Sequence, residues 1–147
     1  MPLLMVAYLC DFVKLFPVHF GYTYGRIFGI MLQMEMRIVR DTIPVADLKP
    51  IAAAWYGDMI KGVVDVEQEI LVLGGEYHMD ANTVLTENGS KQSNVWGFNI
   101  HLNKPREEWI EFLSLINIRP AQGNRQMKIE DETLCARIAD IVNKKIT

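Results

Sequence analysis

Hydrophobic and polar residues alternate first along residues 36–43, MRIVRDTI, which is typical of a β-strand with one face on a core. Two further short runs rich in β-branched residues follow, at 62–66 and 69–73, and a few polar residues separate them. This spacing predicts a β-hairpin. Because Ile70–Leu73 is apolar on both faces, we expect that strand to be central in its sheet.

Two more strands are predicted in the second half of the chain. Residues 95–102 alternate, with aromatic side chains on one face and Asn99 on the other. Residues 110–118 alternate between isoleucine-rich and mixed positions, and we expect one long strand there. The turn between them, KPREE, is polar.

Helical spacing of apolar residues predicts helices at Pro44–Trp55 and Asp131–Lys145. Pro50 should kink or restart the first of them, since proline removes a helical hydrogen bond. Asp80 can cap a shorter helix that ends near Gly89. Together these elements predict a single small α+β domain, with an antiparallel or mixed sheet of about five strands and the two long helices on one face.

Residues 1–35 break with this pattern, because they are rich in Leu, Phe, Tyr and Met and poor in charge. Three interpretations remain open. The segment is an upstream-start artefact, with the true start at Met34 or Met36; it is a membrane-associated leader; or it is a folded part of the domain. We take residues 36–147 as the domain, and expect residues 1–35 to be dispensable for its folding.

Composition narrows the classes of function. The chain is 50% hydrophobic and 22% charged, which fits a globular protein, and its net charge of -3 argues against a nucleic-acid binder. Cys10 and Cys135 are too few for a disulfide framework or a zinc site, so a cytoplasmic location is expected. Residues 36–147 contain no apolar run of membrane-spanning length, so a membrane protein is not expected.

Several blocks from Met36 onward resemble a family of small prokaryotic proteins described as a domain of unknown function, number 5674. The blocks that carry the resemblance are Gly57-Asp58-Met59, Gly74-Gly75-Glu76 with His78 and Asp80-Ala81, Gly89-Ser90 with Gln92, Trp96-Gly97 with Asn99, and Ser114–Pro120 with Gln122, Asn124 and Arg125. The resemblance covers about three quarters of the chain. It implies no activity and supplies no catalytic residues.

Glu76, His78 and Asp80 are the candidates for catalysis. They alternate, so on an extended backbone their side chains would share one face and form an acid–base set or part of a metal site. The alternative is structural, with Asp80 capping the next helix and His78 packing at the strand end. No metal or cofactor is assigned, and no Ser-His-Asp, nucleophile-elbow or cysteine-based pattern supports covalent catalysis.

A polar loop directly after the predicted long strand is the candidate ligand site. Two guanidinium groups, amides and a glycine at a strand end suit phosphate or carboxylate. Asparagines on otherwise apolar strands must find partners if they are buried, either in a polar pocket or in a structural network. The predicted ligand-binding set is Arg119, Arg125, Asn117, Asn99, Gln122 and Asn124.

Two functions follow from these patterns. The first is a domain that binds, or acts on, an anionic small molecule. The second is a non-catalytic module that binds a protein partner or associates with itself. Convergence of His78, Asn99 and the polar loop in one pocket would favour the first, whereas their scatter over a flat face would favour the second.

Overall fold

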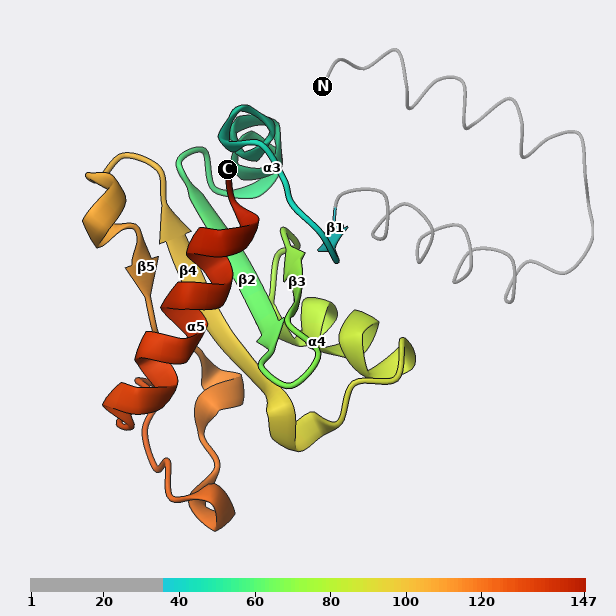
Figure 1. Cartoon of the computed structure of the whole chain (residues 1–147), viewed down its shortest axis with the longest axis vertical. Helices are drawn as coiled ribbons and strands as arrows, with labels where there is room; N and C mark the ends of the chain where they lie inside the picture. The colour runs from blue at the N-terminus through green and yellow to red at the C-terminus, as the bar shows by residue number, and fades with distance from the viewer. Residues whose placement is uncertain (1–35) are drawn as a thin grey trace, which may run out of the picture. The chain divides into compact units, whose positions relative to one another are not determined.

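The computed structural model describes residues 36–147, and the interpretations of residues 1–35 lie outside this range. Five strands form one open sheet in the order β1-β3-β2-β4-β5, and every neighbouring pair is antiparallel (Figure 1). The strands are β1 (Arg37–Val39), β2 (Met59–Asp65), β3 (Ile70–Leu73), β4 (Val95–His101) and β5 (Ile110–Glu111). The predicted hairpin is confirmed as β2–β3, and β3 is buried along its whole length.

Three α-helices accompany the sheet in the described part of the chain: α3 (Leu48–Trp55), α4 (His78–Glu87) and α5 (Glu132–Lys145). Short 3-10 turns lie at Val45–Asp47, Gln92–Asn94, Arg106–Glu108, Leu115–Asn117 and Pro120–Gln122. The α+β prediction is therefore confirmed. In Figure 1, α5 crosses the front of the sheet and α4 lies behind it.

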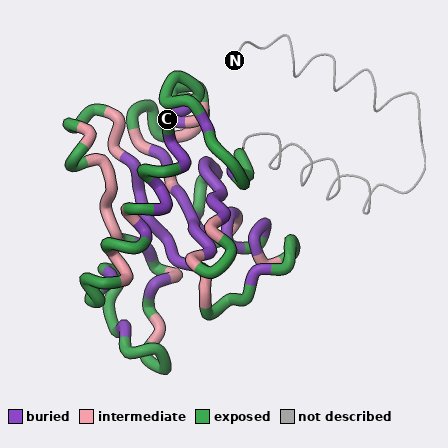
Figure 2. Tube along the Cα trace, viewed as in Figure 1, coloured by how far each residue is buried: buried purple, intermediate pink, exposed green. Residues whose placement is uncertain are grey.

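The two faces of the sheet carry separate cores. One core joins α3 and α5 to the sheet. Its sheet residues include Val64 of β2, Leu71 of β3 and Phe98 of β4, whose side chains point to the same face. The other joins α4 to neighbouring positions such as Val63 and Val72. Helices α3 and α5 thus share a face as expected, and α4 covers part of the opposite face. Figure 2 shows the buried central strands between exposed outer segments.

The residues at the ends of α3 and α5 suit the backbone groups that lack partners within a helix. Pro50 lies in the first turn of α3, where backbone N–H groups have no partner within the helix. The helix predicted at 44–55 is divided into the 3-10 turn Val45–Asp47 and α3, which starts just before this proline. The Asp131 carboxylate accepts hydrogen bonds from the backbone N–H groups of Thr133 and Leu134, and caps α5. The lysines at the end of α5 match the negative end of its dipole.

The predicted long strand at 110–118 is wrong. Strand β5 ends at Glu111, after pairing with Asn99 and Ile100 only. The chain then makes a single bridge from Leu113 to Lys128 and turns into the 3-10 segment Leu115–Asn117. The observed burial does not alternate here: Ser114 and Asn117, on opposite faces of the predicted strand, are both buried, whereas Leu115 is exposed.

No helix in residues 36–147 is long and apolar enough to cross a membrane.

A chain that starts at Met36 is expected to unfold cooperatively, because the described residues 36–147 by themselves place a core on each face of the sheet. Thermal unfolding of the shortened and the full-length proteins, followed by circular dichroism, tests this. An insoluble product, or one that melts without a cooperative transition, would show that residues 1–35 contribute to the fold.

Candidate functional site

A pocket of about 320 Å³ lies on the α4 face of the sheet, beyond the point where the helix begins. Lys61 of β2 and Asn99 of β4 line it, and they are direct partners across the two strands. His78, the first residue of α4, also lines it. The walls are mostly apolar and consist of Tyr77, Met79, Leu113, Ser114, Leu115, Ile116 and Met127.

Strand alternation explains why polar groups reach this pocket. Val63 and Val95 point to the same face as Lys61 and Asn99, but they pack under α4. Toward the start of β2 and the end of β4 the helix no longer covers the sheet. There Lys61 and Asn99 present an ammonium group and an amide on the same face. The polar pair thus lies where the second core ends.

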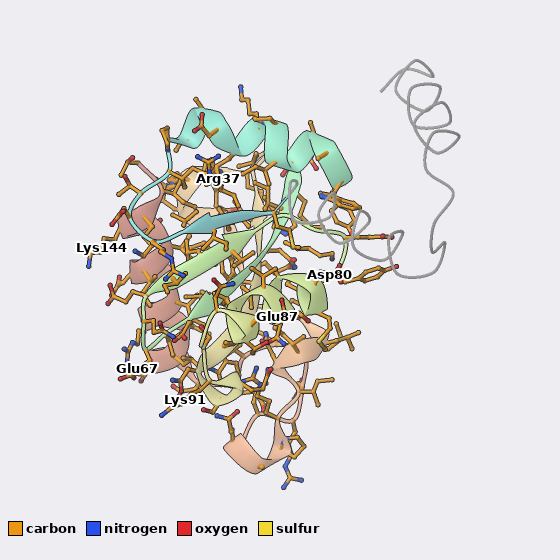
Figure 3. The ribbon with its side chains drawn as sticks, turned by 90° about the vertical axis from the view of Figure 1, so that its right-hand side faces the viewer. Arg37, Glu67, Asp80, Glu87, Lys91 and Lys144 are labelled. Carbon is orange, nitrogen blue, oxygen red and sulfur yellow. The ribbon has the colours of Figure 1, made fainter. Side chains whose placement is uncertain are left out.

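The start of α4 fixes the position of His78. Tyr77 is the N-cap residue, and the Asp80 carboxylate accepts a hydrogen bond of 3.2 Å from the Tyr77 backbone N–H. Figure 3 labels Asp80 at the start of the helix and Glu87 at its end. Asp80 therefore has the capping role that the sequence offered as the alternative to catalysis.

His78 is buried and its ring is anchored to the sheet. Its Nε2 lies 2.9 Å from the carbonyl oxygen of Phe98, so this nitrogen carries the proton and donates it. Burial lowers the pKa of His78, and the nearby Lys61 charge lowers it further, against the raising effects of the Phe98 carbonyl and the Asn99 amide. The imidazole is consequently neutral at pH 7, with Nδ1 as an acceptor.

Asn99 is only 6% exposed, and of the two polar atoms of its side-chain amide only the nitrogen forms hydrogen bonds among the described residues. Its Nδ2 donates to the Glu111 carboxylate at 2.8 Å and to the Leu113 carbonyl at 3.2 Å. Its Oδ1 is buried and has no hydrogen-bond partner in the described part of the chain. Buried acceptors are nearly always paired, so this unpaired oxygen marks Asn99, which lines the pocket next to His78, as a residue whose acceptor a ligand can satisfy.

Glu111 holds the orientation of Asn99. Its carboxylate accepts from His101 at 3.0 Å as well as from Asn99. The hydrogen bond from His101, followed by that from Asn99, lowers the pKa of Glu111, so the carboxylate is charged at neutral pH. With a carboxylate on its Nδ2, the Asn99 amide cannot flip without placing oxygen against oxygen, so Oδ1 stays on the side of the amide away from Glu111.

Lys61 supplies positive charge. Its Nζ lies 4.7 Å from the centre of the Tyr56 ring, a cation–π contact. The ion pairs among residues 36–147 join His101 to Glu111 and Lys144 to Glu69, and neither includes Lys61. Within the part of the chain that the structure describes, the ammonium has no carboxylate partner and can bind an anion at the pocket.

An apolar rim surrounds the opening, and we use this name for Tyr77, Met79, Leu113, Leu115 and Met127. Leu115 is 70% exposed, Tyr77 60% and Met79 57%. Single exposed apolar residues are common, but a group of them around one pocket marks a binding surface.

A second hollow, of about 360 Å³, runs along residues 37–43 beside Asn88. Its lining contains none of the buried unpaired polar atoms found among the described residues. We therefore place the candidate site at the first pocket, where such an atom is present.

The structure does not bring the proposed catalytic trio together. His78 and Asp80 belong to a helix, so the extended backbone that would have aligned them with Glu76 is absent, and that premise is wrong. Of the three, only His78 lines the pocket. Residues 36–147 also contain no cluster of three or more His, Cys, Asp or Glu side chains that could hold a metal ion.

Asn117 and Arg119 lie along the edge of β4 that β5 leaves uncovered. The Asn117 side chain is fully buried; its Oδ1 accepts from the Gly97 N–H at 2.8 Å, and its Nδ2 donates to the Gly97 carbonyl at 2.9 Å. Arg119 stacks on Trp96 at 4.6 Å and donates to the carbonyls of Val95, Gln92 and Ile116. Both side chains thus form hydrogen bonds with the backbone of β4 that a neighbouring strand would otherwise form.

The remaining loop residues mostly form hydrogen bonds that stabilise the conformation of the loop. Asn124 is 5% exposed and donates to three carbonyls, those of Asn117, Gln126 and Lys128. Gln122 donates to the Ser93 carbonyl at 3.0 Å. Arg125 is exposed, and its backbone N–H donates to Glu130. Of the six residues predicted to bind a ligand, Asn99 alone lines the pocket.

Sequence reasoning missed Lys61 and the apolar rim. A lysine inside the strand MIKGVVD is an available signal, because a charge there must face solvent or a site. Its meaning depends on the pairing of Lys61 with Asn99, which only the fold supplies.

Comparisons with known proteins identify a family for the chain. Neither a search of curated proteins nor a search of solved structures finds a match. The model of a family described as "Protein of unknown function (DUF5674)" matches residues 37–145, a range that contains all five strands, the three helices and every residue of the pocket. The chain belongs to this family of unknown function.

Proposed function

We propose that the domain binds an organic anion with an apolar body in the pocket between β2, β4 and the start of α4. The observation that carries the proposal is the pairing of Asn99 with Lys61 across β2 and β4: among residues 36–147, the buried Oδ1 of Asn99 has no hydrogen-bond partner and the Lys61 ammonium has no ion-pair partner. The ammonium suits a carboxylate or phosphate, and Oδ1 suits an N–H or O–H of the same ligand. The walls suit a hydrocarbon group, and the volume lies at the lower end of ligand pockets.

Arg119 is left out of this binding set, because its guanidinium already donates to backbone carbonyls. Arg125 has an exposed side chain in the same loop and stays a candidate for a second contact with anions. Neither arginine lines the pocket in which Asn99 and His78 meet.

Lys61→Met is expected to weaken the binding of small carboxylates roughly tenfold or more, because a hydrogen bond to a charged group contributes about 1.5–3 kcal/mol. Methionine keeps the apolar stem, so the fold should persist. Suitable probes are 4-methylpentanoate and benzoate, with their primary amides as neutral controls, titrated while amide NMR signals are followed. Lys91→Met is the matched control, since exposed Lys91 follows the opposite end of α4 (Figure 3).

Equal affinity of wild type and Lys61→Met for every carboxylate, or shifts confined to the loop at 119–125, would contradict a site at this pocket. The alternative function, a protein-interaction or self-associating module, is favoured by the exposed apolar rim. A purely apolar contact would not depend on Lys61, so the same variant separates the two functions.

A further inference from the structure

The polar end of the pocket has a definite pattern of donors and acceptors. Lys61 offers only donors and positive charge, whereas Asn99 offers only an acceptor, because both hydrogens of its amide are engaged. The two residues are cross-strand partners on one face, where Cβ atoms lie about 4.5–5.5 Å apart. A ligand must therefore carry an anionic group and a hydrogen-bond donor close together.

The apolar walls add a third requirement. Leu113, Ile116 and Met127 line the pocket beside the polar pair, so a hydrocarbon group must lie next to the anion and the donor. The α-carbon of an amino acid carries these three groups, namely a carboxylate, an N–H and a side chain. A free amino acid fits poorly, however, because its ammonium group would lie beside Lys61 and the two charges would repel.

The extent of the apolar rim indicates what is attached to that nitrogen. Leu115, Tyr77 and Met79 line the pocket and are still more than half exposed, so a ligand that fills the pocket alone leaves much of their apolar surface uncovered. An acyl group on the nitrogen removes the unwanted charge and leaves the N–H as a donor. A preceding peptide residue does the same, and its side chain would also cover part of the rim.

Resting on the proposed function, we propose that the pocket binds the carboxy terminus of a peptide that ends in an apolar residue. The terminal carboxylate pairs with Lys61, the N–H of the last residue donates to Asn99 Oδ1, and its side chain enters the pocket. The preceding residues lie on the apolar rim. Capture of a terminal carboxylate is a recurring mode of peptide recognition, in which backbone groups fix the register and one side chain gives specificity.

The sharpest test changes the ligand one atom at a time and leaves Asn99 intact, because its Nδ2 holds Glu111 and Leu113. The parent probe is a fluorescent peptide, amino-terminally acylated, that ends Ala-Ala-Leu with a free carboxylate. One analogue has a carboxamide at its end. Another has an ester in place of the last peptide bond, which exchanges the N–H for an oxygen without added bulk. N-acetylleucine represents the terminal residue alone.

Fluorescence anisotropy with the full-length chain should show the parent binding roughly tenfold or more tightly than either analogue. Lys61→Met should remove the difference between acid and carboxamide but keep the difference between peptide and ester. Lys91→Met should change neither ratio. N-acetylleucine, measured by competition, should bind more weakly than the peptide because it leaves the rim uncovered.

Equal binding of acid, carboxamide and ester would overturn the peptide-terminus inference. If the simple carboxylates bind in a Lys61-dependent manner and no peptide does, the inference fails while the proposed function stands. If neither class binds, both fail. N-acetylleucine binding as tightly as the peptide would identify a small acylated amino acid as the ligand, and would overturn the assignment to a peptide.

Discussion

Asn117→Leu is expected to lower the free energy of unfolding by about 3 kcal/mol or more. The Asn117 amide pairs with both the N–H and the carbonyl of Gly97, and also donates to the Met127 carbonyl at 3.2 Å. Leucine fills a similar volume but leaves these peptide groups buried without partners, and each such group costs about 1–3 kcal/mol. Urea unfolding followed by tryptophan fluorescence measures the loss.

The matched control is Asn143→Leu on the exposed face of α5, which should change stability by no more than about 0.5 kcal/mol. Anion binding gives a second readout. Since Asn117 does not line the pocket, any folded Asn117→Leu protein should keep its affinity for carboxylates. A stability loss below about 1 kcal/mol would show that water or a backbone shift satisfies Gly97.

Ile138→Ala is expected to cost about 2–5 kcal/mol, the usual range for truncating a buried isoleucine. Ile138 is fully buried in α5 and belongs to the core that includes Phe98 and Leu71. The loss combines the transfer free energy of the removed methyl and methylene groups with the cavity that they leave. Denaturant unfolding of the variant and the wild type at one pH measures it.

Asp140→Ala on the exposed side of the same helix separates packing from helix propensity, since alanine favours a helix there too. The control should stay within about 0.5 kcal/mol of the wild type. A similarly small effect for Ile138→Ala would mean that α5 does not dock on the sheet.

Elements with strong local signals could be predicted from the sequence. The β2–β3 hairpin follows from two β-branched runs, and α5 follows from a capping aspartate, an apolar stripe and closing lysines. Helix α4 was expected from Asp80, although it begins two residues earlier, at His78. Its cap is Tyr77, and Asp80 serves the first turn from inside the helix.

The region after Glu111 could not be predicted, because alternation does not distinguish a strand from a segment that covers a strand's edge. Ser114 is still extended, and the chain then turns so that Asn117 points at β4. Gly97 permits this close approach, since a Cβ there would lie 2.6 Å from that of Ser114. Such a contact joins positions about twenty residues apart and produces no periodic pattern in the sequence.

The candidate site was only partly within reach of the sequence. His78 and Asn99 were both recognised as polar residues that needed an explanation, and they do line one pocket. Arg119 was assigned to a ligand from its position after a strand, a position that equally suits donation to the neighbouring carbonyls. Lys61 gains its meaning from strand pairing, a long-range property.

The side chains of Asn117 and Arg119 along β4 also bear on how the protein behaves when concentrated or partly unfolded. An uncovered strand is a template for adding strands from other molecules, and this is a common route to aggregation. Here an amide and a guanidinium occupy the backbone groups of Gly97 and Val95 that an incoming strand would need. The loop after β5 thereby protects this edge of β4 against pairing with strands of other molecules. If the loop detaches from β4, the unpaired backbone groups of Gly97 and Val95 become available for such pairing, even while the rest of the domain stays folded.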